Sequence, residues 1–369
     1  MTTPGRGRAQ TVLFAALAVA IWLAKVTGYR PNDYTSSESA HAAAHAGNAQ
    51  AADPPARKRL IISVDVEALP ARQESDHVNR LIWGRFGDAE VGIGRMMQVA
   101  ESHGVRLTFF LDYCEAALYP GAFERITAEI VRRGHDVQLH AHPEVWPADF
   151  WCSLGLVRPP ARLANSFDIE QAGVLFDFLM RTAKECGAPT PVAYRAGGWR
   201  FNAAALHAMA DNGLMLSFNY KAGDPRQPNN DQNLPLFQWS NGVYEVPLGV
   251  VRFAGRACCF SFDSDLPLDD AAAIRGCMDS YFEQFGLDSV LVMIMHSWSF
   301  CVLDSSSGYF SYRNDERVGR FDAFLAHLGS DFTVITASEL ATAIRSGVVK
   351  PALVQDVELM DTARYPPAK

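Results

Sequence analysis

The stretch GAFERITAEIVRRGHDVQLHAHPEVW, residues 121–146, contains a helix and a strand that one glycine separates. Its first half has apolar residues at helical spacing and stops at Gly134, a residue type that commonly ends helices. In its second half, HDVQLHAH alternates apolar and polar residues, as a half-buried strand does. This strand ends in His140 and His142, and Pro143 stops it. This stretch therefore predicts a structural unit that consists of a helix followed by a strand with polar residues at its end.

The same unit recurs along the chain from Leu60 onward. Strands are predicted for these segments: LIISVDVEA (60–68), VRLTFFLD (105–112), HDVQLHAH (135–142), PVAYRA (191–196), LMLSF (214–218) and SVLVMIMHS (289–297). Helices are predicted between them at 92–104, 121–134, 169–187 and 202–213, and the stretch DFTVITASELATAIRSG (331–347) is predicted as a strand that leads into a last helix. Alternating strands and helices imply parallel strands with crossover helices, so we expect an α/β fold and a closed or nearly closed β/α barrel. In such a barrel, chemistry takes place at the carboxyl ends of the strands.

Composition limits the classes of protein to consider. The chain has 369 residues, of which 49% are hydrophobic and 20% charged, as in one large globular domain or two small ones. The net charge is -8 and lysines and arginines form no cluster, which argues against a nucleic-acid partner. The seven cysteines show no CxxC spacing, so zinc-ribbon and thioredoxin sites have no support. An oxidising compartment would allow one or two disulfides, whose pairing cannot be derived.

The N-terminus has the organisation of an export signal. Arg6 and Arg8 precede the apolar run TVLFAALAVAIWLA, which Lys25 closes. No small-x-small cleavage site follows at once, so an uncleaved signal anchor is favoured over a cleaved signal peptide for residues 1–29. We expect a protein anchored in the inner membrane and facing the periplasm, or a periplasmic or secreted protein if the segment is cleaved.

The rest of the chain divides into three parts. Residues 30–58 are rich in Ala, Ser and Pro without apolar periodicity and are expected to form a flexible tether. Residues 59–345 contain the strand and helix units and form the expected barrel. Residues 346–369 are expected as a C-terminal tail.

Polar residues that interrupt the apolar strands gather at the strand ends. Asp65 and Glu67 end the first strand, and His140 and His142 end a middle one. Residues two apart on a strand share a face, so each pair points to the same side at the barrel mouth. Two imidazoles and a carboxylate are the ligand set of an open catalytic divalent-metal site. The second carboxylate is then free to act as a base, and Arg195 and His296 follow later strands in the same way.

Five motifs resemble those of a known family. ISVDVEA, GVRLTFFLD, GHDVQLHAHPEVW, YRAGGWRFN and MIMHSW occur in the order and rough spacing seen in polysaccharide deacetylases of the NodB-homology type, carbohydrate esterase family 4. The resemblance covers residues 60–344. It implies a distorted (β/α)7 barrel and metal-dependent hydrolysis of an N- or O-acetyl group on a glycan.

The resemblance also implies roles for individual residues. Asp65 matches the catalytic base, while the ligand Asp that usually follows it is replaced by Val66, so Glu67 is the natural substitute. Arg195 matches the arginine that pairs with the base and orients it. His296 matches the histidine that acts as general acid. Where relatives often carry an Asp, within GLMLSFNY, this chain has serine and asparagine, at positions 217 and 219.

The sequence leaves two candidates for the third metal ligand, His142 and Glu144. His140 matches the first histidine of the family's His-x-x-x-His motif, and the residue four positions on is Glu144. His142 lies one period-two step from His140 on the same strand face, whereas Pro143 redirects the chain before Glu144. The strand argument favours His142, and the family spacing favours Glu144.

These observations predict a metal-dependent carbohydrate N-deacetylase. Zinc is the expected ion, with cobalt, manganese, iron and nickel as alternatives, and the expected substrate is an exported or envelope polysaccharide containing N-acetylhexosamine. Polysaccharide assembly or export machinery is a further expected partner. Because the usual Asp-Asp and His-x-x-x-His patterns are missing, a catalytically silent glycan-binding barrel is one alternative. A hydrolase acting on a non-sugar amide is another.

Overall fold

The computed structural model describes residues 57–361, apart from residues 69, 158–159, 161–162, 225–226, 228–231 and 313–315. The expected signal segment and nearly all of the expected tether lie outside the described residues. Within them, no helix is both long enough and apolar enough to cross a membrane. The seven cysteines all lie in the described part and are free thiols.

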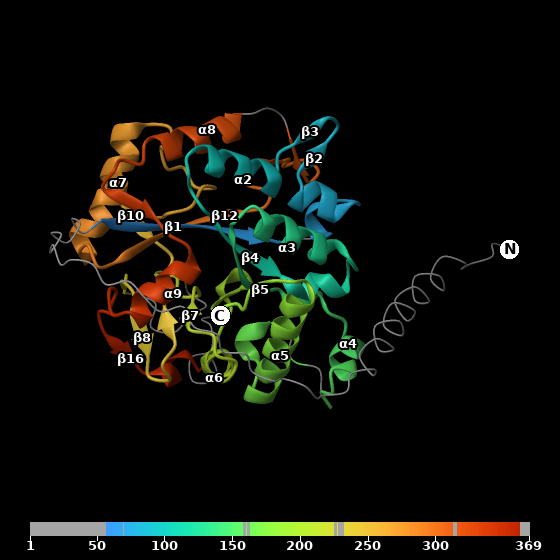
Figure 1. Ribbon diagram of the computed structural model, residues 1–369. Coiled ribbons are helices and arrows are strands. Elements are labelled where there is room, and N and C mark those ends of the chain that lie inside the picture. The colour runs from blue at the N-terminus through green and yellow to red at the C-terminus, as the bar shows by residue number, and fades with distance from the viewer. Residues whose placement is uncertain are drawn as a thin grey trace, which may run out of the picture. The chain divides into compact units, whose positions relative to one another are not determined.

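Ten strands form the main sheet, in the order β12-β1-β4-β5-β6-β7-β9-β8-β16, with β15 beside the start of β1. Neighbouring strands are parallel except for the antiparallel pair β8 and β9. The strands are β1 (Lys58–Val66), β4 (Thr108–Asp112), β5 (Asp136–Ala141), β6 (Ala193–Ala196), β7 (Leu216–Ser217), β8 (Phe237–Trp239), β9 (Tyr244–Glu245), β12 (Val290–His296), β15 (Phe332–Val334) and β16 (Val354–Gln355). In Figure 1 the arrows of β1, β4 and β5 run in the same direction.

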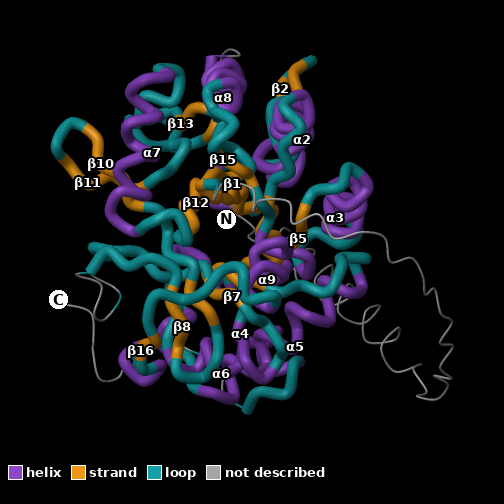
Figure 2. Tube along the Cα trace, turned by 60° about the vertical axis from the view of Figure 1, so that its left-hand side comes forward, coloured by secondary structure: helices purple, strands orange, loops and turns teal. Residues whose placement is uncertain are grey.

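Helices surround these strands, as Figure 2 shows. The α-helices are α2 (Ile93–Ser102), α3 (Ala122–Arg132), α4 (Ala148–Ser153), α5 (Ile169–Glu185), α6 (Ala203–Asp211), α7 (Ala271–Phe285), α8 (Glu316–Ala326) and α9 (Ala337–Arg345). Shorter helices are η1 (Pro70–Arg72), η2 (Val78–Ile82), η3 (Tyr113–Ala117), η4 (Pro143–Val145), η5 (Ala164–Ser166), η6 (Gly197–Trp199) and η7 (Val357–Met360). Helices α2, α3, α5 and α6 each connect two parallel strands, so the predicted strand and helix units are confirmed up to β7.

The alternation of strands and helices is interrupted after β7 and resumes with α7, β12, α8, β15 and α9, so the strict alternation expected from the sequence is confirmed only in part. Strands β8 and β9 form an antiparallel hairpin, and its turn contains the Asn241-Gly242 pair that favours such turns. Pro235 and Pro247 flank this hairpin and disfavour a helix there. Three further hairpins lie outside the main sheet: β2 (Arg85–Phe86) with β3 (Ala89–Glu90), β10 (Val250–Phe253) with β11 (Arg256–Cys259), and β13 (Val302–Leu303) with β14 (Phe310–Ser311). The described sheet is therefore a curled, mostly parallel half-barrel.

The segment after residue 345, expected as a tail, contributes to the fold as far as Asp361. Strand β16 pairs in parallel with β8 through Val354 and Gln355. His207 of α6 contacts Glu358 of η7, with 3.0 Å between Nε2 and Oε1. Both contacts attach this segment to the half of the fold that contains α6.

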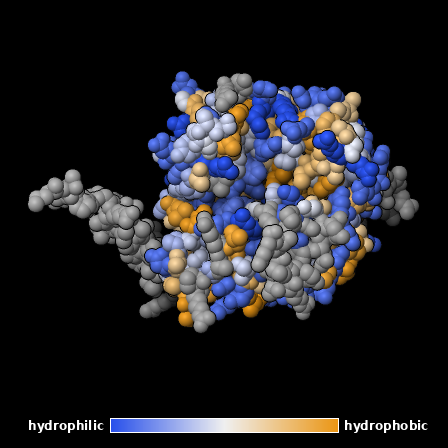
Figure 3. Space-filling view, turned by 180° about the vertical axis from the view of Figure 1, so that it is seen from behind, coloured by the Kyte–Doolittle hydropathy of each residue, from blue (hydrophilic) through white to orange (hydrophobic). Residues whose placement is uncertain are grey.

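The two faces of the sheet carry different side chains because alternate strand residues point to opposite sides. On β1, Leu60, Ile62 and Val64 pack in the larger apolar core that includes residues of α2, α3, α5, α6, α7 and α8. Ile61 faces the other way, into a smaller apolar cluster that Leu340 of α9 helps to fill. Most large apolar side chains are therefore inside, and hydrophilic residues predominate on the face shown in Figure 3.

Candidate functional site

The predicted strand-end residues lie at neighbouring positions across the sheet. Asp65 at the end of β1 pairs with His296 at the end of β12. On the neighbouring strands, Asp112 of β4 pairs with His140 of β5, and His140 pairs with Arg195 of β6. The structure thus brings to one end of the sheet residues that are up to 231 positions apart in the sequence.

Glu67, His140 and His142 form a cluster that could bind a metal ion, since their ligand atoms lie within 4.8 Å of one another. The Oε2 atom of Glu67 is 2.7 Å from Nε2 of His142 and 3.6 Å from Nε2 of His140. Glu67 Oε2 and His140 Nε2 are both buried without a hydrogen-bond partner. Buried polar atoms normally have partners, so this pair of atoms fits a bound cation.

The other ring nitrogens of these histidines are held by acceptors. His140 Nδ1 lies 2.9 Å from the carbonyl oxygen of Arg195, and because a carbonyl only accepts, Nδ1 carries the proton. His142 Nδ1 lies 2.9 Å from Oε1 of Glu144, which also accepts a hydrogen bond from Arg200. Metal-binding histidines usually have such partners on the nitrogen away from the ion. Glu144 therefore lies behind His142 and outside the cluster of three.

Burial and charge act against each other in this cluster. Burial alone would raise the pKa of Glu67, but the charge of His142 and the close contacts with both histidines hold that pKa well below its usual value. Burial would lower the pKa of His142, yet Glu67 and Glu144 raise it well above the usual value. A proton on His142 therefore balances the negative charge. A cation bound by these residues would take the place of that proton.

Asp65 is fixed by a buried arginine. Arg195 donates one hydrogen bond to Oδ1 of Asp65 at 2.6 Å and another to the hydroxyl of Ser63 at 2.9 Å. Its guanidinium lies 4.3 Å from the ring centroid of Phe110 and 5.6 Å from that of Phe218, and these two rings pack on each other. Breaking a buried ion pair leaves an uncompensated charge, so this arrangement keeps the carboxylate in one orientation.

His296 of β12 is paired with Asp65 of β1 in the sheet. Its side chain contacts Asp263, an aspartate that the sequence analysis missed. Its Nδ1 is 3.3 Å from Oδ2 of Asp263, which also accepts from Ser299 and, through Oδ1, from Arg317. Its Nε2 is 4.0 Å from Oε1 of Glu67. Burial lowers the pKa of His296, but the hydrogen bond to Asp263 and nearby carboxylates raise it above its usual value overall.

Asp112 and Glu115 are two further buried acids beside the cluster. Asp112 accepts hydrogen bonds from the backbone N–H groups of Cys114 and His142, and its Oδ2 has no hydrogen-bond partner. Burial raises the pKa of Asp112 to about 6 and that of Glu115 well above its usual value. Asp112 ends a predicted strand, as Asp65 nearly does, so the strand-end pattern could have identified it. Asp263 follows no predicted strand and gave no such signal.

Asn219 occupies the region where an aspartate is common in the family that the sequence resembles. Its side-chain oxygen accepts from the backbone N–H of Ala196 at 2.6 Å, and its amide donates to the hydroxyl of Ser217. Glu245 accepts from the backbone N–H groups of Asn219 and Tyr220. These contacts hold the end of β6 next to Arg195, and neither Ser217 nor Asn219 contacts Asp65 in the hydrogen bonds of the described residues.

Comparisons with known proteins agree on the fold. No protein-family model and no curated protein sequence matches this chain. A proposed polysaccharide deacetylase from Mycobacterium smegmatis superposes with a TM-score of 0.51 at 16% identity, over 83% of this chain and 96% of that one. A 4-alpha-glucanotransferase from Thermococcus litoralis has a TM-score of 0.52 at 10% identity, over 82% of this chain and 42% of that one.

A family 4 carbohydrate esterase from Streptomyces lividans, solved with acetate, also matches, with a TM-score of 0.37 at 13% identity over 75% of this chain and 91% of that one. The likeness at these identities is one of fold, and the chain has a fold found in polysaccharide deacetylases. The glucanotransferase shares it, so the fold alone does not choose the reaction and the side chains must.

Proposed function

We propose that this protein is a metal-dependent hydrolase that removes acetyl groups from N-acetylated sugars of a polysaccharide. The observation that carries the proposal is the convergence of ligand atoms of Glu67, His140 and His142 within 4.8 Å of one another, with His140 Nε2 buried and without a hydrogen-bond partner. Asp65 and His296, the proposed base and the proposed acid, lie beside this cluster. The deacetylase-like fold agrees with this assignment.

In the proposed site, Glu67, His140 and His142 hold a divalent cation, and zinc suits two imidazoles and a carboxylate. Such a cation supplies a Lewis acid that polarises a carbonyl oxygen and makes a water molecule more acidic. Glu144, the alternative ligand that the family spacing suggested, acts through His142 in this proposal. It accepts the Nδ1 proton and so directs Nε2 of His142 toward the ion.

Two residues move protons in the proposed reaction. Asp65 accepts a proton from the attacking water, and Arg195 holds its carboxylate in place for that step. His296 gives a proton to the departing nitrogen of the sugar, because an amine leaves poorly unless it is protonated. Asp263 raises the pKa of His296 and so keeps it protonated to higher pH.

Acetate release tests this proposal. Purified protein is incubated with polymers of N-acetylglucosamine, N-acetylgalactosamine and N-acetylmannosamine, with and without a chelator, and metal content is measured in the same preparation. We expect acetate from at least one polymer, loss of activity with chelator, and recovery on adding zinc. Protein that contains little metal and releases no acetate would instead support a catalytically silent glycan-binding barrel. Release of acetate from simple amides but from no polymer would support a non-sugar amidohydrolase.

A further inference from the structure

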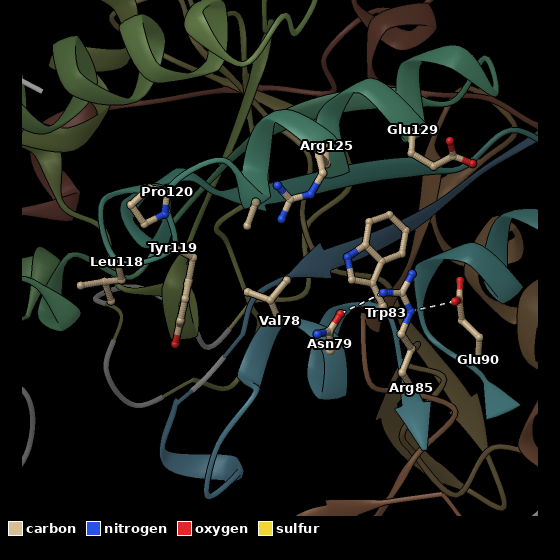
Figure 4. A pocket seen from close by; sticks show the side chains of 11 residues that line it. Val78, Asn79, Trp83, Arg85, Glu90, Leu118, Tyr119, Pro120, Arg125 and Glu129 are labelled. Carbon is tan, nitrogen blue, oxygen red and sulfur yellow. Dashed lines mark hydrogen bonds and ion pairs between the residues drawn. The ribbon is translucent and has the colours of Figure 1, made fainter. Parts of the chain in front are cut away.

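A hollow lies between α3 and the chain that connects β1 to α2, apart from the candidate metal and catalytic site. It encloses about 820 Å³, within the range of roughly 300–1,000 Å³ typical of small-molecule sites. Figure 4 shows its lining residues, which come from η2, the β2–β3 hairpin, the start of α3 and the segment before it. These residues are Val78, Asn79, Trp83, Arg85, Glu90, Leu118, Tyr119, Pro120, Ala122, Arg125 and Glu129. None of them belongs to the candidate metal and catalytic site.

The lining combines flat apolar surfaces with hydrogen-bonding side chains. Trp83 is partly exposed, with the Arg85 guanidinium 5.4 Å from its ring centroid, and Leu118 is 39% exposed although it is apolar. Near them, the lining includes the guanidinium of Arg125. A sugar ring has an apolar C–H face and a rim of hydroxyls that both donate and accept hydrogen bonds. An aromatic ring and planar polar groups match both features.

The guanidinium of Arg125 has N–H donors that no described side chain accepts. Arg85 donates to Glu90 at 2.9 Å and to Asn79 at 3.0 Å, and Glu129 accepts two hydrogen bonds from Arg132. Arg125 forms no ion pair or side-chain hydrogen bond with any residue that the structure describes. A ligand that brings hydroxyl or other oxygen acceptors would supply what its guanidinium lacks.

The hollow connects to the catalytic end of the sheet through η3. Leu118 and Tyr119 follow η3 directly, and Glu115 within η3 accepts a hydrogen bond from the backbone N–H of Ala68, next to Glu67. Tyr119 also bonds His77 at 2.9 Å, which ties this segment to the chain after β1. The loops that follow the carboxyl ends of β1 and β4 therefore line the hollow and border the metal cluster.

We propose that this hollow binds a sugar unit of the substrate chain at a distance from the acetyl group that is removed. Trp83 stacks on the sugar ring and Arg125 donates hydrogen bonds to its oxygens. The inference rests on the proposed function, and it adds that the protein prefers a polymer over a single sugar or a disaccharide. A chain that fills the hollow gains contacts that a short substrate cannot reach.

Binding of short and long oligosaccharides tests the proposal. The probes are dimers and hexamers of β-1,4-linked N-acetylglucosamine and of α-1,4-linked N-acetylgalactosamine, titrated calorimetrically into Asp65→Asn protein loaded with zinc. We expect at least one hexamer to bind about tenfold more tightly than its dimer. Adding Trp83→Ala should remove most of that advantage and leave dimer binding unchanged. Trp83→Phe should keep it.

Arg125→Ala provides a second variant that does not disturb the core, because its side chain is exposed. It should also weaken hexamer binding alone, whereas Arg181→Ala, at an exposed arginine of α5, should not. Equal hexamer binding with and without Trp83 and Arg125, or no hexamer advantage in either series, would overturn the inference. If wild-type protein releases no acetate but hexamer binding still depends on Trp83, the proposed reaction fails and the sugar site stands.

Discussion

Asp65 and Glu67 are two residues apart and face the same side of β1, yet their surroundings suit them for different tasks. Asp65 is held by Arg195, a cation that cannot give up its proton. Glu67 lies next to Nε2 of both His140 and His142, with which it could share a metal ion. The surroundings of Asp65 therefore suit the proposed proton transfer, and those of Glu67 suit the proposed metal binding.

Asp65→Asn is expected to lower the turnover number by about 10²–10⁴-fold, the usual effect of removing a general base. Because Asp65 is outside the cluster of three ligand residues, zinc content should stay close to that of wild-type protein. The two quantities are measured on one preparation, by acetate release and by elemental analysis. Near-wild-type turnover in Asp65→Asn would end the assignment of this residue as the base.

Replacement of His142 and Glu144 distinguishes a metal ligand from its support. His142→Ala removes a nitrogen that points at Glu67, so zinc affinity should fall by more than about 100-fold. Glu144→Gln removes only the carboxylate behind that ring, and a loss of about 10–100-fold is expected. Competition with a coloured chelator measures both. A larger loss for Glu144→Gln than for His142→Ala would show that the family spacing was the better guide to the ligand.

Asp263→Asn should change the pH dependence of the reaction. Asp263 raises the pKa of His296, so its removal lowers that pKa. A general acid works only while protonated, and activity is lost as the pH rises through its pKa. The alkaline limb of the profile of kcat against pH should therefore move to lower pH. An unchanged alkaline limb would exclude His296 as the acid that controls it.

At the level of elements, the turn after β6 brings the site together. Gly197 begins η6, and a Cβ atom at this position would lie 2.5 Å from the ring of His142. The same turn carries Arg200, which reaches Glu144. One glycine thus allows the histidine to approach from β5 while the following residues supply its support.

Gly197→Ala is accordingly expected to displace His142 and to weaken zinc binding by at least about tenfold, in line with changes next to a ligand. Gly173→Ala is the matched control: it adds the same methyl group on α5, where nothing lies within 4 Å. It should leave zinc binding unchanged and, as alanine is the better helix former, slightly stabilise the protein. Equal zinc affinity in both variants would show that His142 does not depend on this close approach.

Where the pattern of strands and helices is regular, the sequence was sufficient to predict which residues lie together at the site. Asp65, His140, Arg195 and His296 all lie at strand ends, and the register of parallel strands brings such ends together without further information. Asp263 could not be found this way, because its segment joins the sheet through a single bridge, from Ser261 to Ile294.

No strands or helices were predicted from the sequence between residues 218 and 289, for a related reason. Strands β7 and β9 have two residues each and β8 has three, too few for an apolar period to stand out. The Asn241-Gly242 turn was a usable signal for the hairpin there. Contacts between side chains, such as Glu144 with His142 and Arg200, depend on rotamers and loop paths that no sequence period encodes.

At the scale of the whole molecule, the candidate site concentrates negative charge. Asp65, Glu67, Asp112, Glu115 and Glu144 are all at least partly buried near one end of the sheet. Burial raises the pKa of Asp112 to about 6 and that of Glu115 well above its usual value. A divalent cation would offset much of the remaining charge, which is one reason to expect that metal binding stabilises this end of the fold.

The proposed site of action is the periplasmic side of the inner membrane, and it depends on residues 1–29. The apolar run of residues 11–24, which follows Arg6 and Arg8, is the proposed anchor. If it holds the protein in the membrane, full-length protein should sediment with membranes, and external protease should digest it in spheroplasts. Leu17→Arg places a charge in the apolar run and should release the protein from membranes, whereas Ser36→Arg, in the expected tether, should not. A soluble mature form whose first residue follows Tyr29 would show instead that the segment is a cleaved signal peptide.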